Sequence, residues 1–320
     1  MWSQRISHLI DSIKVSPLIQ EPLGTSNQSI HLTPHAVSQL NHLKLNTSQY
    51  LPGFTAGTRA SIRRRPAFDF REHRTYVPGD DVRYVDWKAS ARQEHIFIKQ
   101  GEYPKEASVH ILLDCSRSMD WGNPRKHDSA RRLTAALGYT ALSQGDRLII
   151  QPMSSKSIQH LGPISGKGQV PTMLNYLQNI TCNGHTDLTE GVKGLTKRTR
   201  GGLVLIISDL LDVSNLDEAI GLVPVPTWDV LVIHLLNTEE VNPTIQGNFK
   251  MVDIETGETA NYDINQDSLN TYMQRLDSWQ DELEIICNEN NSFYSLIQGD
   301  WSLEQRVIPH LRSLNILVPA

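Results

Sequence analysis

The sequence predicts an α/β fold in which helices flank a mostly parallel β-sheet. From residue 108 onward, strand-like and helix-like segments alternate along the chain, and this order is typical of a sheet covered on both faces. Ile111–Leu113 and Leu203–Ile207 are continuous apolar runs, as expected of strands that are buried on both sides. Polar side chains follow each run, at the strand ends where open α/β sheets bind their ligands.

Periodicity and apolar runs place the segments of this alternation. Strands are expected over residues 108–114, 147–153, 203–208, 230–236 and 293–297. Helices are expected over residues 129–142, 170–180, 187–197, 215–222, 266–289 and 303–314. The helix over 266–289 has the clearest pattern, because its apolar side chains recur every three or four residues. Residues 249–264 alternate as a hairpin with a tight turn at 255–258.

The chain divides into three parts. Residues 1–50 are expected to form an N-terminal helical arm, in which Thr33 and Pro34 suit a helix N-cap and a first helical position. Residues 51–105 are rich in Gly, Pro and Arg, and we expect loops and a few short strands there. Residues 106–320 contain the α/β pattern, with the hairpin and the last helices at the C-terminal end.

Composition favours a soluble cytoplasmic protein. The 320 residues are 39% hydrophobic and 20% charged, which is ordinary for a globular chain. No apolar run approaches the roughly 20 residues that cross a bilayer, and the first residues lack the apolar region of a signal peptide. The three cysteines are scattered, which fits a reducing compartment. The net charge of −5 gives no general reason to expect nucleic acid as a partner.

Arginine is concentrated in one stretch, residues 59–74. The stretch contains Arg59, Arg63, Arg64, Arg65, Arg71 and Arg74. Only Asp69 and Glu72 oppose them there. We interpret it as a solvated loop with internal ion pairs. The alternative is a docking surface for an acidic partner, an anion or a nucleic acid.

Oxygen-bearing side chains gather where the predicted strands end. Asp114, Ser116 and Ser118 occupy alternate positions at the end of the strand over 108–114, so an extended backbone turns all three the same way. Thr186 precedes the helix over 187–197, and Asp209 follows the strand over 203–208. Each alone could be a helix N-cap. Together on one α/β framework they predict a site for Mg²⁺, which prefers oxygen ligands.

This pattern resembles the metal-ion-dependent adhesion site of von Willebrand factor type A domains. The match is Asp-x-Ser-x-Ser, a later Thr and a later Asp, and the resemblance covers roughly residues 105–300. It implies a von Willebrand A-like, Rossmann-like sheet. It also implies that the serines and the threonine bind Mg²⁺ directly or through water, while the aspartates often act through water. One coordination position is then left for a Glu or Asp of a protein partner. Mn²⁺ and Ca²⁺ are the alternative metals.

A second resemblance runs from about residue 35 to the end. The stretch from Phe68 to Trp87, FDFREHRTYVPGDDVRYVDW, resembles the signature of the bacterial "domain of unknown function 58" family, with Asp69 where that family usually has Glu. Many members carry N-terminal membrane helices, which are not expected here. Members are typically encoded beside MoxR-type AAA+ ATPases, so the resemblance implies such an ATPase as partner.

The role of the Gly79–Trp87 part of that signature stays open. Its paired carboxylates, Asp80 and Asp81, could perform acid–base chemistry or bind a second ion. We favour a structural Arg–Asp network, and we expect Trp87 to anchor a core.

The function we expect is that of a non-enzymatic, Mg²⁺-dependent protein-binding module, an adaptor of a MoxR-type ATPase in assembling or remodelling a client complex. A metal-dependent phosphoester hydrolase is the enzymatic alternative, but no general base stands out. No P-loop or nucleophile elbow is present in the sequence. His127, His185 and Cys182 could make a softer metal site, although we expect lone histidines near loops to be solvated.

Overall fold

The computed structural model describes residues 30–47, 69–78, 82, 85–92, 95–102, 107–154, 159–182, 184–186, 188–196, 201–211, 214–224, 227–252 and 259–320. The chain forms two compact units, and each has its own fold. Residues 1–49 and 107–320 make the first, called here the sheet domain. Residues 50–106 make the second, the hairpin segment.

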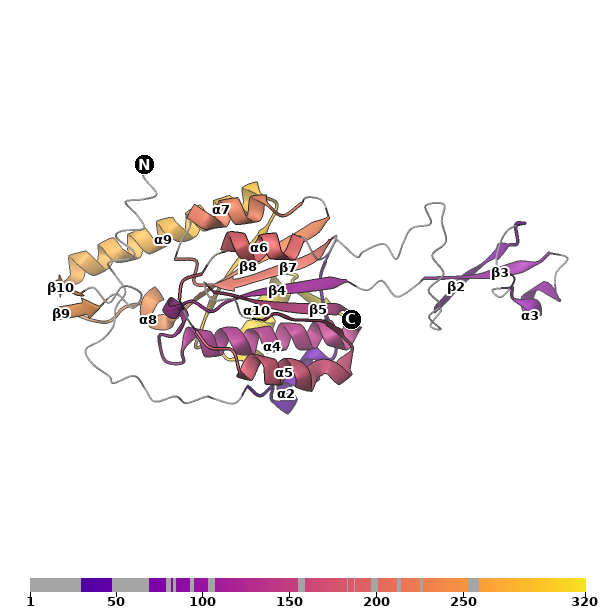
Figure 1. The fold of residues 1–320 in the computed structure, drawn as a ribbon, viewed down its shortest axis with the longest axis horizontal. Coiled ribbons are helices and arrows are strands. Elements are labelled where there is room, and N and C mark those ends of the chain that lie inside the picture. The colour runs from indigo at the N-terminus through magenta and orange to yellow at the C-terminus, as the bar shows by residue number, and fades with distance from the viewer. Residues whose placement is uncertain are drawn as a thin grey trace. The chain divides into compact units, whose positions relative to one another are not determined.

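A six-stranded β-sheet forms the centre of the sheet domain (Figure 1). Its strand order is β11-β8-β7-β4-β5-β6. The strands are β4 (Ser108–Asp114), β5 (Arg147–Met153), β6 (Leu161–Ser165), β7 (Gly202–Ser208), β8 (Trp228–Leu236) and β11 (Phe293–Gln298). All neighbours pair in parallel except β6, which runs antiparallel to β5. In chain order this is the Rossmann-type arrangement, and its order reverses between β4 and β7.

Helices cover both faces of this sheet (Figure 1). One face packs against α4 (Lys126–Gln144) and α5 (Val170–Gln178), and the other against α6 (Leu188–Thr196), α7 (Ser214–Gly221) and α9 (Gln266–Glu289). Alternate residues of one strand enter different cores, because Ile111 and Leu113 join the first and Leu112 joins the second. This is the double burial that the apolar runs predicted. The predicted α/β fold class is confirmed.

The described part of the N-terminal arm packs within the sheet domain. Helix α2 (Pro34–Leu40) begins at Thr33, whose side chain accepts a hydrogen bond from the Ala36 N–H at 3.1 Å. Strand β1 (Leu43–Leu45) pairs antiparallel with β12 (Leu317–Pro319). Tyr139 on α4 donates its hydroxyl proton to Asn41 Oδ1 at 2.8 Å. Residues 30–47 therefore tie α4 to the last strand of the chain.

The described part of the sheet domain also contains short elements and a hairpin. The short elements are η3 (Arg117–Met119), η4 (Lys167–Gln169), α8 (Thr238–Val241) and the π-helical turn η5 (Leu303–Val307). The predicted hairpin is present as β9 (Gly247–Val252) and β10 (Thr259–Ile264), although its turn at 255–258 lies outside the described residues.

The helix expected over 303–314 is instead η5 followed by α10 (Ile308–Ser313). Pro309 lies in the first turn of α10. Because proline has no N–H to donate four residues back, the chain cannot continue one regular α-helix through it. The wider π turn precedes that break.

The hairpin segment consists of β2 (Asp69–Thr75), β3 (Phe97–Glu102) and the single-turn helix α3 (Trp87–Ser90). Asp86 is the N-cap of α3, since its Oδ1 accepts from the Lys88 and Ala89 N–H groups, and its Oδ2 lies 2.9 Å from His73 Nε2. Asp86 thus has a structural role. Of the signature's other acids, Asp80 and Asp81 lie outside the described residues.

The expectation that Trp87 anchors a core is wrong, because its side chain is 66% exposed. In the same helix, Ala89 and Ser90 are half-buried, and Ser90 Oγ accepts from the Phe97 N–H of β3 at 2.9 Å. The arginines at 59, 63, 64 and 65 lie outside the described residues, so the predicted solvated loop stays a prediction.

We predict that Leu205→Ala lowers the free energy of unfolding by about 2–5 kcal/mol, because Leu205 is fully buried in the central strand β7 and its loss leaves a cavity. Urea unfolding followed by circular dichroism measures this. The matched control is Ile285→Ala on α9, a residue that is 56% exposed, for which we expect a change within about 0.5 kcal/mol. Equal effects of the two substitutions would contradict the buried position of β7.

Candidate functional site

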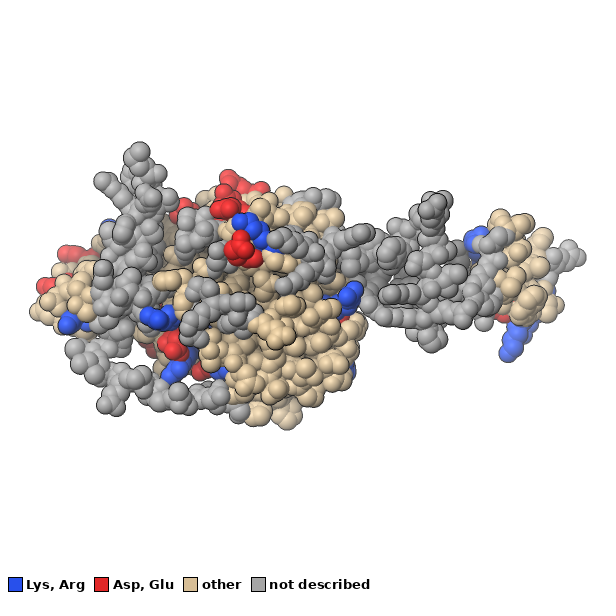
Figure 2. Space-filling model, viewed as in Figure 1, with Lys and Arg blue, Asp and Glu red and all other residues tan. Residues whose placement is uncertain are grey.

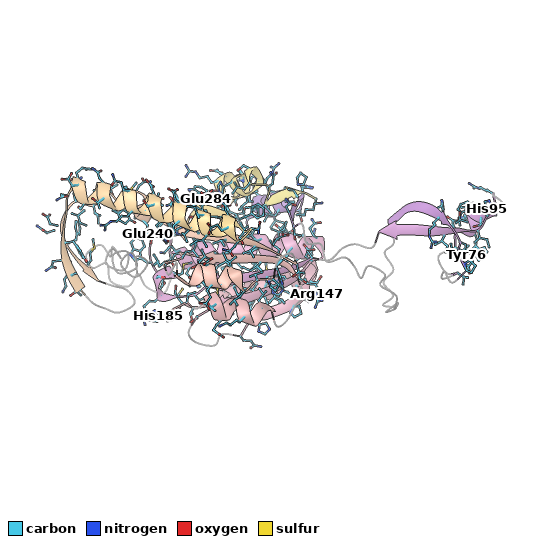
Figure 3. All side chains as sticks on the ribbon, turned by 90° about the horizontal axis from the view of Figure 1, so that it is seen from above. Tyr76, His95, Arg147, His185, Glu240 and Glu284 are labelled. Carbon is cyan, nitrogen blue, oxygen red and sulfur yellow. The ribbon has the colours of Figure 1, made fainter. Side chains whose placement is uncertain are left out.

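The candidate residues lie at the carboxyl edge of the sheet. In Figure 3, His185 and Glu240 lie across the sheet from Arg147, the first residue of β5. Strands β4 and β7 end at this edge, next to each other, and the order of the sheet reverses between them. A reversal of this kind opens a crevice above the sheet, where ligands of α/β proteins bind.

Asp114 is the centre of a hydrogen-bonded cluster at this edge. Its Oδ1 accepts from the Ser116 N–H at 2.8 Å and from the Thr186 hydroxyl. Its Oδ2 accepts from the hydroxyl of Ser208, the last residue of β7. Asp114 is 1% exposed. Both carboxylate oxygens are therefore held in place by neutral donors from three different segments.

The two serines connect Asp114 to Asp209. The chain turns at η3, which brings Ser116 Oγ within 2.8 Å of Ser118 Oγ. The Ser118 side chain in turn hydrogen-bonds to Asp209, which is 2% exposed. The structure thus brings together all five residues that the sequence singled out, Asp114, Ser116, Ser118, Thr186 and Asp209.

Sequence reasoning missed Ser208, which supports the cluster from the side. Besides donating to Asp114, its Oγ accepts from the Leu210 N–H at 3.0 Å. Leu210 has a φ of +52°, a conformation that costs free energy for a residue with a Cβ. The Ser208 side chain thereby stabilises the sharp turn that places Asp209. The sequence did contain a signal for Ser208, because it is the one polar residue that ends the apolar run of β7.

Two buried carboxylates face each other across the cluster. Burial, and secondly the charge of Asp209, raise the pKa of Asp114 to about 6. Burial also acts to raise the pKa of Asp209, but the nearby Lys126 ammonium outweighs it and holds that pKa below its usual value. The two carboxylates therefore repel each other, and a cation bound between them would relieve this repulsion.

Lys126, the first residue of α4, is a second residue that sequence reasoning missed. It is 1% exposed, and its Nζ donates to Asp209 Oδ2 at 3.0 Å and to Glu240 Oε1 at 2.7 Å. Burial alone would lower the pKa of this lysine, but the charges of Asp209 and Glu240 raise it. Lys126 is accordingly a buried ammonium ion bound between two carboxylates.

The donor set fits a hard divalent cation. Carboxylate and hydroxyl oxygens are the ligands that Mg²⁺ accepts, with water at its remaining positions. In the described parts of the chain, no group of three or more His, Cys, Asp and Glu side chains could hold a metal. A metal at this edge would therefore depend on the serine and threonine hydroxyls as well as on Asp114 and Asp209.

The softer site considered for His127, His185 and Cys182 is not assembled. His127 is 6% exposed on α4, with Nε2 3.2 Å from the Ile180 carbonyl oxygen, so the expectation that it is solvated is wrong. His185 is exposed, as expected, and Cys182 is half-buried. Burial raises the pKa of the Cys182 thiol, which disfavours the thiolate that metal binding needs.

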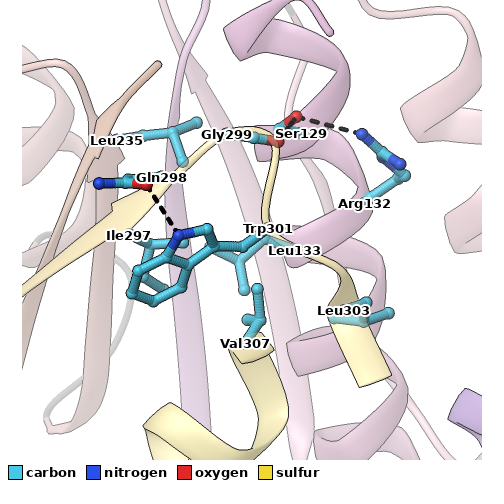
Figure 4. A pocket seen from close by; sticks show the side chains of 10 residues that line it. All are labelled: Ser129, Arg132, Leu133, Leu235, Ile297, Gln298, Gly299, Trp301, Leu303 and Val307. Atoms are coloured by element: carbon cyan, nitrogen blue, oxygen red, sulfur yellow. Dashed lines mark hydrogen bonds between the residues drawn. The ribbon is translucent and has the colours of Figure 1, made fainter. Parts of the chain in front are cut away.

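A small cavity of about 30 Å³ lies away from this cluster, beside α4, β11 and Trp301 (Figure 4). Its walls are mainly apolar, and its polar groups already bond each other. Trp301 Nε1 donates to Gln298 Oε1 at 2.9 Å, and Arg132 donates to Ser129 Oγ at 3.2 Å. The space suits about one water molecule, so we regard it as a packing defect.

On the face that Figure 2 shows, Lys and Arg side chains of the sheet domain lie among acidic and uncharged ones. None of the helices in the described ranges is long and apolar enough to span a bilayer.

Comparison with protein families identifies the chain. The model of the family described as "Protein of unknown function DUF58" matches residues 72–282, which includes the β4 and β7 edge. The chain belongs to the DUF58 family. Relatives of this DUF58 chain include "Uncharacterized protein Mb1516" of Mycobacterium bovis and "Uncharacterized protein Rv1480" of Mycobacterium tuberculosis. Each is 27% identical over 237 residues, covering 72% of this chain and 74% of the relative.

Solved structures with some likeness to this DUF58 chain include the conserved hypothetical protein BatB from Bacteroides thetaiotaomicron, at 16% identity and a TM-score of 0.38 over 65% of this chain and 98% of BatB. Proximal thread matrix protein 1 from the mussel byssus is 10% identical, with a TM-score of 0.39 over 67% of this chain and 47% of that protein. These scores are low, so the fold assignment rests on the strand order of the chain itself.

We predict that His127 makes stability depend on pH. Burial lowers its pKa to about 4, from about 6.5 when exposed. The unfolded chain therefore binds the extra proton first, and this contribution to stability, present above pH 6.5, is lost as the pH falls towards 4. The loss corresponds to about 3 kcal/mol. Urea unfolding at pH 7 and pH 4.5 should show the wild type losing more than His127→Gln, whose side chain does not titrate. Parallel losses would contradict the buried, neutral imidazole.

Proposed function

We propose that this DUF58 chain is a non-enzymatic, Mg²⁺-dependent protein-binding module. The observation that carries the proposal is the composition of the edge cluster. The five proposed ligands are three hydroxyl-bearing side chains and only two carboxylates, and they meet at the carboxyl edge of β4 and β7 in one hydrogen-bonded group. Neutral hydroxyls leave a bound dication with most of its positive charge, so the ion can attract a carboxylate from outside the chain.

Five residues would hold the ion, namely Asp114, Ser116, Ser118, Thr186 and Asp209. When bound, Mg²⁺ would supply a coordination position for a Glu or Asp of the partner, as the resemblance to von Willebrand A domains implies. The hydrogen bonds of Asp114 arrange the hydroxyls before the ion arrives, which lowers the cost of assembling the site. Mn²⁺ and Ca²⁺ are the alternative metals, because both take oxygen ligands.

The partner we propose is a MoxR-type AAA+ ATPase, for which the chain would act as adaptor in assembling or remodelling a client complex in the cytoplasm. Membership of the DUF58 family supports this assignment, since members are typically encoded beside such ATPases.

Phosphoester hydrolysis is the less well supported hypothesis for the function of this site. Hydrolysis needs a base that reaches the substrate. His234 on β8 lies near Asp209, but it is fully buried, and its Nδ1 is 2.7 Å from the Tyr294 hydroxyl oxygen. Burial lowers the pKa of His234 to about 3, so it also accepts a proton poorly. We therefore propose binding and not turnover.

We predict that Ser116→Ala/Ser118→Ala weakens Mg²⁺ binding at least tenfold, because two oxygen ligands are lost while the fold is kept. Titration calorimetry with MgCl₂ measures this. The matched control is Ser278→Ala/Ser313→Ala, which removes two exposed serines that bond carbonyl groups within α9 and α10. Wild-type protein that binds no Mg²⁺, or a double variant that binds it unchanged, would refute the metal site.

We predict that a MoxR-type ATPase from the same organism is retained on immobilised wild-type protein in Mg²⁺ and released by EDTA. The Ser116→Ala/Ser118→Ala variant should fail to retain it, while the Ser278→Ala/Ser313→Ala control should behave as the wild type. Retention that ignores both metal and substitution would place the contact elsewhere on the chain.

A further inference from the structure

Lys126 lies next to the proposed ligand set without belonging to it. The adhesion-site pattern contains Asp, Ser and Thr but assigns no role to a lysine. Here an ammonium group that is almost fully buried donates to one of the five residues, Asp209, and to Glu240 on α8. A lone lysine of this kind would be costly to bury, so both carboxylates are needed to keep it there.

Hydrogen bonds hold both the backbone and the ammonium group of Lys126 in position. Its backbone N–H donates to the Trp121 carbonyl oxygen at 2.9 Å. Glu240, which receives the ammonium, is itself held, because its Oε2 accepts from the Asn237 N–H at 2.7 Å and its backbone carbonyl accepts from the Tyr272 hydroxyl at 2.6 Å. Asn237 Nδ2 also donates to the Trp121 carbonyl, at 3.2 Å.

Gly122 allows the loop before α4 to close over this contact. Its φ is +96°, and a Cβ there would lie 1.5 Å from Asn237 Nδ2. No other residue would let the chain approach Asn237 so closely. The loop before α4 and the segment after β8 are therefore packed together, with the Lys126–Glu240 pair beside them. This arrangement holds the ammonium against Asp209.

The ammonium changes how Asp209 can act on a cation. One oxygen of Asp209, Oδ2, is already bound by Lys126. The carboxylate therefore offers a metal less negative charge than a free aspartate would, and the lysine itself repels a dication. Since the environment is buried, water screens this repulsion only weakly.

We propose that Lys126 is a fixed internal cation that limits the negative charge Asp209 gives a bound metal, so that the metal keeps enough positive charge to take a partner's carboxylate. The proposal deepens the proposed function and rests on it. Lys126 is a positioning residue, because it acts through Asp209. Its effect is to weaken metal binding by the chain alone, in favour of binding that involves the partner.

The test uses Mg²⁺ alone as the probe, in titration calorimetry with three forms of the full chain. Lys126→Met/Glu240→Gln removes the cation and one of its two carboxylates, so the net charge of the edge is unchanged and Asp209 is freed from the ammonium. We expect this variant to bind Mg²⁺ at least about tenfold more tightly than wild type. A merely structural ion pair predicts unchanged or weaker binding, because disrupting packing does not create affinity.

Glu240→Gln alone should have the opposite effect. Lys126 then keeps only Asp209 as a charged partner, so the positive charge near the site is less compensated, and we expect weaker Mg²⁺ binding. This single variant keeps the proposal falsifiable if the double variant does not fold. Wild-type affinity in Glu240→Gln would overturn the proposal, as would equal or weaker binding by a folded double variant.

Arg131→Met/Asp128→Asn is the matched control. It removes another buried ion pair of α4, whose arginine otherwise donates to the carbonyl oxygens of Leu177 and Gln178. We expect this control to lower thermal stability and to leave the Mg²⁺ affinity unchanged. A tighter Mg²⁺ affinity in this control as well would show that loosening α4 suffices, and would overturn the role of Lys126.

Comparing the Mg²⁺ titrations of the wild type and the double variant distinguishes a failure of this proposal from a failure of the proposed function. If the wild type binds Mg²⁺ and a folded Lys126→Met/Glu240→Gln variant binds it no more tightly, the proposed function stands and the role of Lys126 fails. If neither binds, both proposals fail.

Discussion

The parallel register of β4 and β7 is the constraint on which the edge cluster depends. Leu113 pairs with Ile207, so the two strands end level with each other. Asp114 and Ser208 then follow at the same height, and Asp209 one residue later. A slip of one residue in either strand would turn its side chains to the opposite face of the sheet, moving its acid away from the other and its apolar residues out of their cores. The same strand register is therefore required both to bury the apolar residues of the sheet and to place the two acids side by side.

Placing two acids side by side in a buried edge creates an electrostatic problem, and the chain answers it with two kinds of group. Neutral donors hold Asp114 from three directions, while a full positive charge, Lys126, holds Asp209. The two acids are consequently unlike each other, because burial and Asp209 raise the pKa of Asp114 whereas Lys126 lowers that of Asp209. A cation arriving at this edge would meet one acid with neutral partners and one already paired with a charge.

The sequence was sufficient for the parts of this arrangement that follow from local pattern. The apolar runs of β4 and β7 need burial wherever they lie, and side chains at alternate positions after β4 turn together, so the five oxygen-bearing residues could be grouped. Lys126 could not be found in this way. Its partners lie 83 and 114 residues further along the chain, and a lysine next to an arginine in a loop-like stretch looks solvated until the fold is known. The prediction that Trp87 anchors a core was wrong for a different reason. Whether a large apolar residue on a one-turn helix is buried depends on how that helix is oriented, and the local sequence does not determine this orientation.

The pairing of β1 with β12 has a consequence for how the protein is made. Leu43 and Leu45 are buried, yet the strand they pair with ends one residue before the end of the described chain, at Pro319. During synthesis these leucines leave the ribosome long before residues 317–319 do, so they have no strand to pair with until those residues have been made. The central sheet can begin to form earlier, whereas the pairing of β1 must wait for β12. Nascent chains arrested before residue 317 should thus expose the arm to proteases and to chaperones.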